Sequence, residues 1–242
     1  MADILRVHMP YPGFVPATDA VAAQRHPPFG METTTDGSWF GYLQCDQREA
    51  LLQMLMDPSL HFVMVICPLM GRDQLDELEA RLVCDMRRLY QKLLEKHRLT
   101  MRHYCTVNRK CSDLEAFLNH VKAKNDVDTI HRAQGQECDV ATISFCASQG
   151  VIDSAQSFFW YDLALLNVAL SRARRKTILV LDQTILNGIG ALDSNKVIKA
   201  FHLIHALKMA ASSPLPDGRR VAHMIELEGV RMPQNMESEA QR

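Results

Sequence analysis

Phe62-Val-Met-Val-Ile-Cys67 is a continuous apolar run that ends at Pro68. A short run of this kind is typical of a strand that is buried on both faces of a parallel sheet. Asp73 to His97 follows, and its leucines and one methionine recur every three or four residues, which predicts a long helix with one apolar stripe. A buried strand followed by an amphipathic helix is the repeating unit of a parallel α/β sheet.

The same alternation extends along the chain. Helices are expected at 46–56, 111–124, 162–175 and 195–211, and strands at 101–107, 127–131, 140–146 and 177–181. Because crossovers between parallel strands are right-handed, this order predicts the fold class as α/β, with a RecA-like, mostly parallel sheet and helices on both faces. In such sheets function lies at the carboxyl ends of the strands, so the polar segments after Cys67 and His131 are the first candidates for a site.

Composition predicts three parts along the chain. Residues 1–45 are rich in proline and glycine and are expected to form an irregular lead-in or the truncated start of a domain. Residues 46–211 form the α/β domain, with an insertion near 99–125. Residues 212–242 are polar, and they are expected to form a flexible tail.

Charge and composition narrow the class of protein. The net charge of −1 does not indicate a nucleic-acid partner and, taken alone, favours an enzyme or interaction domain without one. No apolar run approaches the roughly 20 residues that span a bilayer, and the N-terminus has no signal-peptide core. We therefore expect no membrane partner and an intracellular location, cytoplasmic or nuclear. The 7 cysteines are scattered without a C-x-x-C pair, so no metal site is expected.

One motif of nucleotide enzymes is missing. The sequence contains no G-x-x-x-x-G-K-[ST], and no glycine-rich loop follows a predicted strand. No segment can therefore cradle phosphates as a Walker A loop does. Hydrolysis of ATP by these 242 residues alone is not expected.

Thr129-Ile-His-Arg-Ala-Gln-Gly-Gln-Glu-Cys-Asp139 joins two predicted strands through a polar turn. Gly135 permits a positive φ and a close approach of the backbone to a ligand. Gln134 and Glu137 offer hydrogen-bonding groups to a ribose or to a water bound to phosphate. The alternative is a plain turn with solvated side chains, and the segment alone does not decide between them.

Leu165-Leu-Asn-Val-Ala-Leu-Ser-Arg-Ala-Arg-Arg-Lys176 is expected to be helical through Arg175. Cations in a last helical turn interact favourably with the helix dipole, which explains most of the final residues. Arg172 differs because it lies between Ser171 and Ala173, from where a guanidinium can reach a transferring phosphoryl group as an arginine finger.

The two segments in this order resemble motifs V and VI of superfamily 1 helicases, especially the branch typified by the nonsense-mediated-decay helicase. Val63 to Pro68 is similar to motif IV. The resemblance covers roughly residues 46–186, and it includes none of motifs I, Ia, II and III. The segment from Cys105 to Lys124 has no counterpart in the family pattern and is interpreted as the insertion.

The resemblance implies a role for each matching residue. Arg172 would contact the γ-phosphate of ATP, and Gln134, Gly135 and Glu137 would bind the nucleotide. Thr129, His131 and Pro68 would contact the backbone of single-stranded RNA or DNA, which does not read base sequence. ATP and Mg²⁺ would be bound mainly by a first RecA-like helicase domain, acting in cis or in trans.

Three interpretations remain open. The chain is the second motor domain of a helicase, and an enzyme only together with a first domain. Alternatively, it is a non-catalytic module that keeps the fold to bind nucleic acid or protein. The third interpretation is a different α/β nucleotide enzyme that matches the two motifs by chance.

Overall fold

The structure is a computed structural model, and it describes residues 39–105, 126–132, 135–145, 162–187, 195–214, 220 and 222–230. The helices of this part are α3 (Cys45–Met56), α4 (Arg72–His97), α7 (Leu163–Leu170), α8 (Gln183–Asn187) and α9 (Asn195–Ser212). The strands are β1 (Phe62–Cys67), β2 (Met101–Cys105), β3 (Val127–Thr129), β4 (Cys138–Ser144), β5 (Ala173–Asp182) and β6 (Ala222–Glu226).

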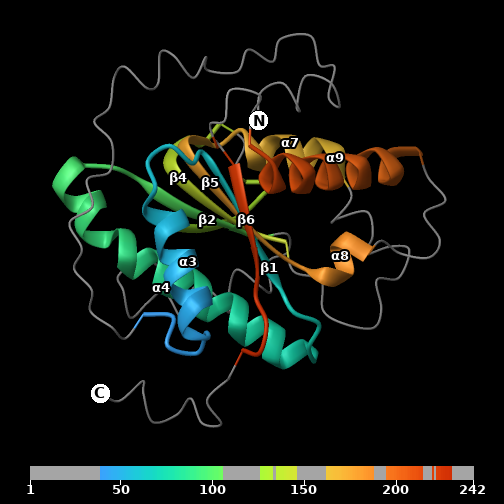
Figure 1. Ribbon diagram of the computed structural model, residues 1–242. Coiled ribbons are helices and arrows are strands. Elements are labelled where there is room, and N and C mark those ends of the chain that lie inside the picture. The colour runs from blue at the N-terminus through green and yellow to red at the C-terminus, as the bar shows by residue number, and fades with distance from the viewer. Residues whose placement is uncertain are drawn as a thin grey trace.

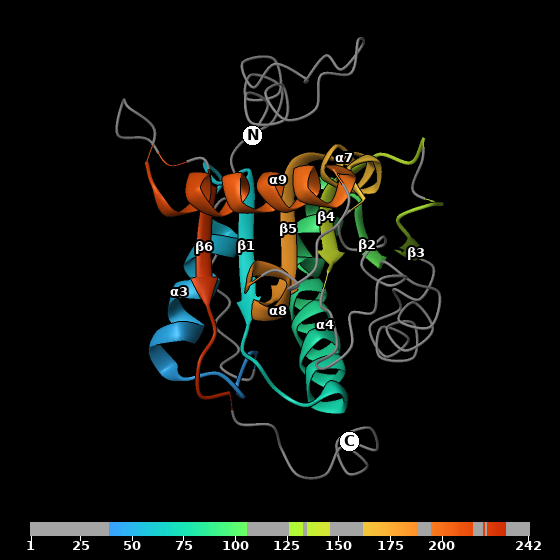
Figure 2. The same ribbon diagram turned by 90° about the vertical axis from the view of Figure 1, so that its right-hand side faces the viewer.

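The described strands form one 6-stranded sheet in the order β3-β2-β4-β5-β1-β6 (Figure 1). Every neighbouring pair is parallel. Figure 2 shows α7, α8 and α9 covering one face of this sheet, while α3 and α4 cover the other. This arrangement confirms the predicted α/β fold class of a parallel sheet with helices on both faces.

The sheet separates two apolar cores. One core packs Leu166, Ala169 and Leu203 of α7 and α9 against alternate residues of the strands. The other packs α3 and α4 against the remaining strand residues. All six residues of β1 are buried, as the uninterrupted apolar run from Phe62 to Cys67 predicted.

Two expectations about the elements are wrong. The helix expected over 162–175 ends at Leu170, and β5 begins at Ala173, four residues before the expected strand. Ala222–Glu226 lie in the stretch expected to be a flexible tail, but they pair with β1 as strand β6. Phe40, in the expected irregular lead-in, lies in a turn, and its side chain is fully buried in the core with α3 and α4.

The insertion expected near 99–125 is described only at its start. Its first part is β2, which lies between β3 and β4 and therefore belongs to the sheet itself. Residues 106–125 lie outside the described residues, so the boundaries of the insertion stay a prediction.

None of the helices that the structure describes is both long and apolar enough to cross a lipid bilayer.

Candidate functional site

The structure divides the predicted site residues between opposite edges of the sheet. Pro68 follows the end of β1, and Thr129 is the last residue of β3, so both lie at the carboxyl edge. Glu137 precedes β4 and Arg172 precedes β5, so both lie at the amino edge. The polar segment after His131 was expected at the carboxyl edge, but Glu137 at the end of that segment lies at the amino edge.

The segment 130–137, of which the structure does not describe residues 133 and 134, begins at the carboxyl edge after β3 and ends at the amino edge before β4. Ile130 is buried at its start, and the Ile130 amide donates to the Cys105 carbonyl at 3.0 Å. Near its end, the Tyr104 hydroxyl donates to the Gln136 carbonyl at 3.3 Å. These contacts tie both ends of the described segment to β2.

Gly135 adopts a φ of +82°, which side chains of L-residues rarely allow. An added Cβ would meet no atom within 4 Å, so the backbone conformation rather than crowding requires glycine here. Gly135 is exposed, as a backbone that binds a ligand must be. Its predicted companion Gln134 lies outside the described residues.

Arg172 lies in the turn between α7 and β5, and not inside a helix. Its Nε donates to the Val168 carbonyl and its Nη2 to the Ser171 hydroxyl, both at 2.9 Å. Its own carbonyl accepts from the Cys138 amide at 3.0 Å, which places Arg172 beside the start of β4. The side chain is half-buried, and its guanidinium forms no ion pair with any residue that the structure describes.

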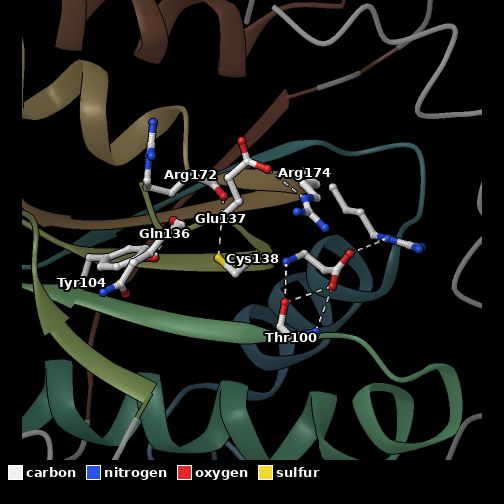
Figure 3. A network of polar contacts seen from close by, with 9 residues as sticks. Thr100, Tyr104, Gln136, Glu137, Cys138, Arg172 and Arg174 are labelled. Carbon is white, nitrogen blue, oxygen red and sulfur yellow. Dashed lines mark hydrogen bonds and ion pairs between the residues drawn. The ribbon is translucent and has the colours of Figure 1, made fainter. Parts of the chain in front are cut away.

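Two ion pairs join the starts of β4 and β5 next to Arg172. Arg174 donates from Nε to Glu137 at 3.1 Å, and Arg175 donates from Nε to Asp139 at 3.2 Å. Figure 3 shows the Glu137 carboxylate joined to Arg174, while the Arg172 carbonyl lies next to Cys138 and the Arg172 guanidinium points away from Glu137. The starts of β4 and β5 therefore bring Arg172, Arg174 and Arg175 together with the carboxylates of Glu137 and Asp139.

Lys176 has a different partner from the one expected. The chain segment 174–176 was interpreted as the cationic end of its own helix, but Lys176 is a buried residue of β5. Its Nζ donates to the carbonyls of Met54, Leu55 and Asp57 at 3.1, 2.7 and 2.8 Å. Lys176 thus binds the carbonyls at the C-terminal end of α3. A cation at a helix C-terminus was expected, but at the end of its own helix and not of α3.

Cys138 is unsuited to act as a nucleophile. Burial raises the pKa of its thiol to about 11, although hydrogen bonding to Tyr104 opposes this. Because the thiolate is the reactive form, a thiol with this pKa stays protonated at neutral pH.

The predicted nucleic-acid residues do not form one compact group. β3 and β1 are separated by β2, β4 and β5, so Thr129 and Pro68 lie roughly 19 Å apart across the sheet. Thr129 is only 6 % exposed, which leaves little side-chain surface for a ligand. His131 is exposed, and Pro68 is half-buried.

Three contributors to the amino edge were not singled out from the sequence: Tyr104, Thr100 and the Arg174 partner of Glu137. Arg174 is 37 residues from Glu137 along the chain, and only the pairing of β4 with β5 brings them together. No local pattern in the sequence indicates such a pair. Among the described residues, no group of three or more His, Cys, Asp or Glu could hold a metal ion.

Comparison with known proteins gives two matches. Residues 70–184 match a protein-family model described as an AAA domain. The chain is also similar to the crystal structure of the C-terminal domain of a possible DNA helicase from Lactobacillus plantarum WCFS1. That match has 18 % identity and a TM-score of 0.29, and it covers 67 % of this chain and 95 % of the other. No curated protein matches the chain.

Proposed function

We propose that this chain is the second, C-terminal motor domain of an ATP-dependent RNA or DNA helicase, with Arg172 as its arginine finger. One observation carries the proposal: the half-buried Arg172 guanidinium has no carboxylate partner among the described residues, and the Arg172 backbone lies at the start of β4, which is next in sequence to Glu137. A structural arginine at such a place is usually neutralised by a carboxylate, as Arg174 and Arg175 are. A guanidinium without one fits a phosphoryl group, which is anionic and binds planar donors well.

The amino edge also offers groups that could bind the ribose of a nucleotide. The exposed Gly135 backbone can approach a ligand closely, and the Glu137 carboxylate can accept hydrogen bonds from sugar hydroxyls. The AAA domain match over residues 70–184 includes all of these residues. A Walker A loop, absent from the 242 residues, would come from a first RecA-like domain that binds most of ATP and Mg²⁺.

The carboxyl edge is proposed as part of a track for single-stranded RNA or DNA. His131 and Pro68 offer side-chain surface there, whereas the buried Thr129 would contribute mainly its backbone. Such contacts follow the phosphate backbone and are independent of base sequence.

The test is ATP hydrolysis by the full chain mixed with a first RecA-like domain of a superfamily 1 helicase, with and without single-stranded nucleic acid. Arg172→Ala should lower the stimulated rate by about 10³-fold, the lower end of the effect of arginine fingers. Arg48→Ala is the matched control, because Arg48 lies on α3 against the Cys45 thiol. An Arg172→Ala rate equal to that of the control would end the proposal.

The alternative is a non-catalytic module that binds nucleic acid or protein. One observation favours it: two nitrogens of Arg172 already donate to Val168 and Ser171, so the guanidinium is folded back on α7. Under this alternative, single-strand binding by the full chain is unchanged by ATP and by Arg172→Ala. Fluorescence anisotropy with a labelled oligonucleotide, measured in the mixture with a first RecA-like domain, distinguishes the two functions.

A further inference from the structure

Two carboxylates at the start of β4 differ in how completely they are bound. Asp139 uses both oxygens: Oδ1 accepts from Arg175, and Oδ2 accepts from the amide and hydroxyl of Thr100 at 2.9 and 3.0 Å. The side chains of Asp139 and Arg175 are only 12 % and 14 % exposed. Asp139 is therefore fully engaged in joining β2, β4 and β5.

Glu137 is bound at one oxygen only. Its Oε2 accepts from Arg174 Nε at 3.1 Å, and no residue in the described ranges donates to Oε1. Both side chains are more than half exposed, at 56 % for Glu137 and 60 % for Arg174. An ion pair so exposed contributes at most about 1 kcal/mol to stability, so stability does not account for it.

A β-bulge brings the two arginines to these carboxylates. Cys138 lies opposite Ala173, but Val140 lies opposite Lys176, so two steps along β4 match three along β5. The extra residue allows consecutive arginines, Arg174 and Arg175, to reach two carboxylates two positions apart, one just before β4 and one within it. Bulges commonly redirect side chains in this way next to functional sites.

We propose that Arg174 is a positioning residue for the ribose of the bound nucleotide, acting through Glu137. This inference rests on the proposed function. A lone exposed glutamate samples many rotamers, and a guanidinium bound to one carboxylate oxygen restricts them. The second oxygen is then directed away from Arg174 and is left to accept from the 2′- and 3′-hydroxyls of a ribonucleotide.

The role predicts a particular kinetic pattern in the mixture of the full chain with a first RecA-like domain. Arg174→Ala should raise KM for ATP about ten-fold, the value of one hydrogen bond to a charged group, and leave kcat within about two-fold. KM for 2′,3′-dideoxy-ATP should not change, because that nucleotide has no hydroxyl for Glu137. Arg174→Lys should recover part of the loss, since an ammonium also binds a carboxylate.

Combining substitutions shows whether Arg174 acts through Glu137. Glu137→Ala should raise KM for ATP as Arg174→Ala does, and the double variant should be no worse than either single one. Additive effects, or an equal rise of KM for 2′,3′-dideoxy-ATP, would overturn the inference and indicate a direct contact of Arg174 with phosphate. If Arg172→Ala is without effect in the same mixture, the proposed function fails instead, and this inference fails with it.

Discussion

At the start of β5, Lys176 places a cation against the carbonyls that end α3. The Lys176 Nζ donates to three carbonyls within 3.1 Å, and the residue is 1 % exposed. Burial lowers the pKa of Lys176 to about 7, although Asp57 opposes this. The ammonium form is therefore disfavoured in the folded chain relative to the unfolded chain.

The pKa of Lys176 makes stability depend on pH. Between about pH 7 and 10.5 the unfolded chain binds more protons at this lysine than the folded chain, so the free energy of unfolding rises with pH. The slope from one such group is at most about 1.4 kcal/mol per pH unit. Lys176→Met should lower stability and remove this slope in urea unfolding between pH 7.5 and 9.5, whereas equal slopes would show that Lys176 does not titrate there.

At the scale of elements, the sequence predicts most helices and strands but not where α7 ends. Asp162 caps that helix by accepting from the amides of Ala164 and Leu165, and the start of the helix was expected there. The end has no glycine or proline, and Ser171 to Arg175 are all compatible with a helix. Pairing of β5 with β4 and β1 decides the boundary, and local sequence does not encode that pairing.

The two ion pairs at the start of β4 and β5 should differ sharply in their effect on stability. Asp139→Ala removes the carboxylate that binds both Arg175 and Thr100 and should lower the free energy of unfolding by about 3 kcal/mol. Glu137→Ala removes an exposed pair and should cost about 1 kcal/mol or less. Urea unfolding of the full chain measures both. Equal losses would mean that the β-bulge does not depend on Asp139.

At the scale of the whole molecule, the sequence did not indicate at which edge of the sheet each predicted site residue lies. The segments around Gly135 and Arg172 were expected to lie together, and the Cys138 amide does donate to the Arg172 carbonyl. Because Arg172 was expected inside a helix, its position just before strand β5 was not predicted. Strand β6 was missed because prolines, glycine and charged residues before it resemble a tail.

We propose that the Arg172 guanidinium breaks its hydrogen bonds to Val168 and Ser171 and binds a phosphoryl group held by another domain. The most direct measurement is a structure of the full chain with a first RecA-like domain, Mg²⁺ and ADP–aluminium fluoride. We expect the Arg172 guanidinium about 3 Å from a fluorine of the phosphoryl mimic, with its bonds to Val168 and Ser171 broken. A guanidinium that keeps both bonds and stays out of reach of the bound mimic would contradict the claim.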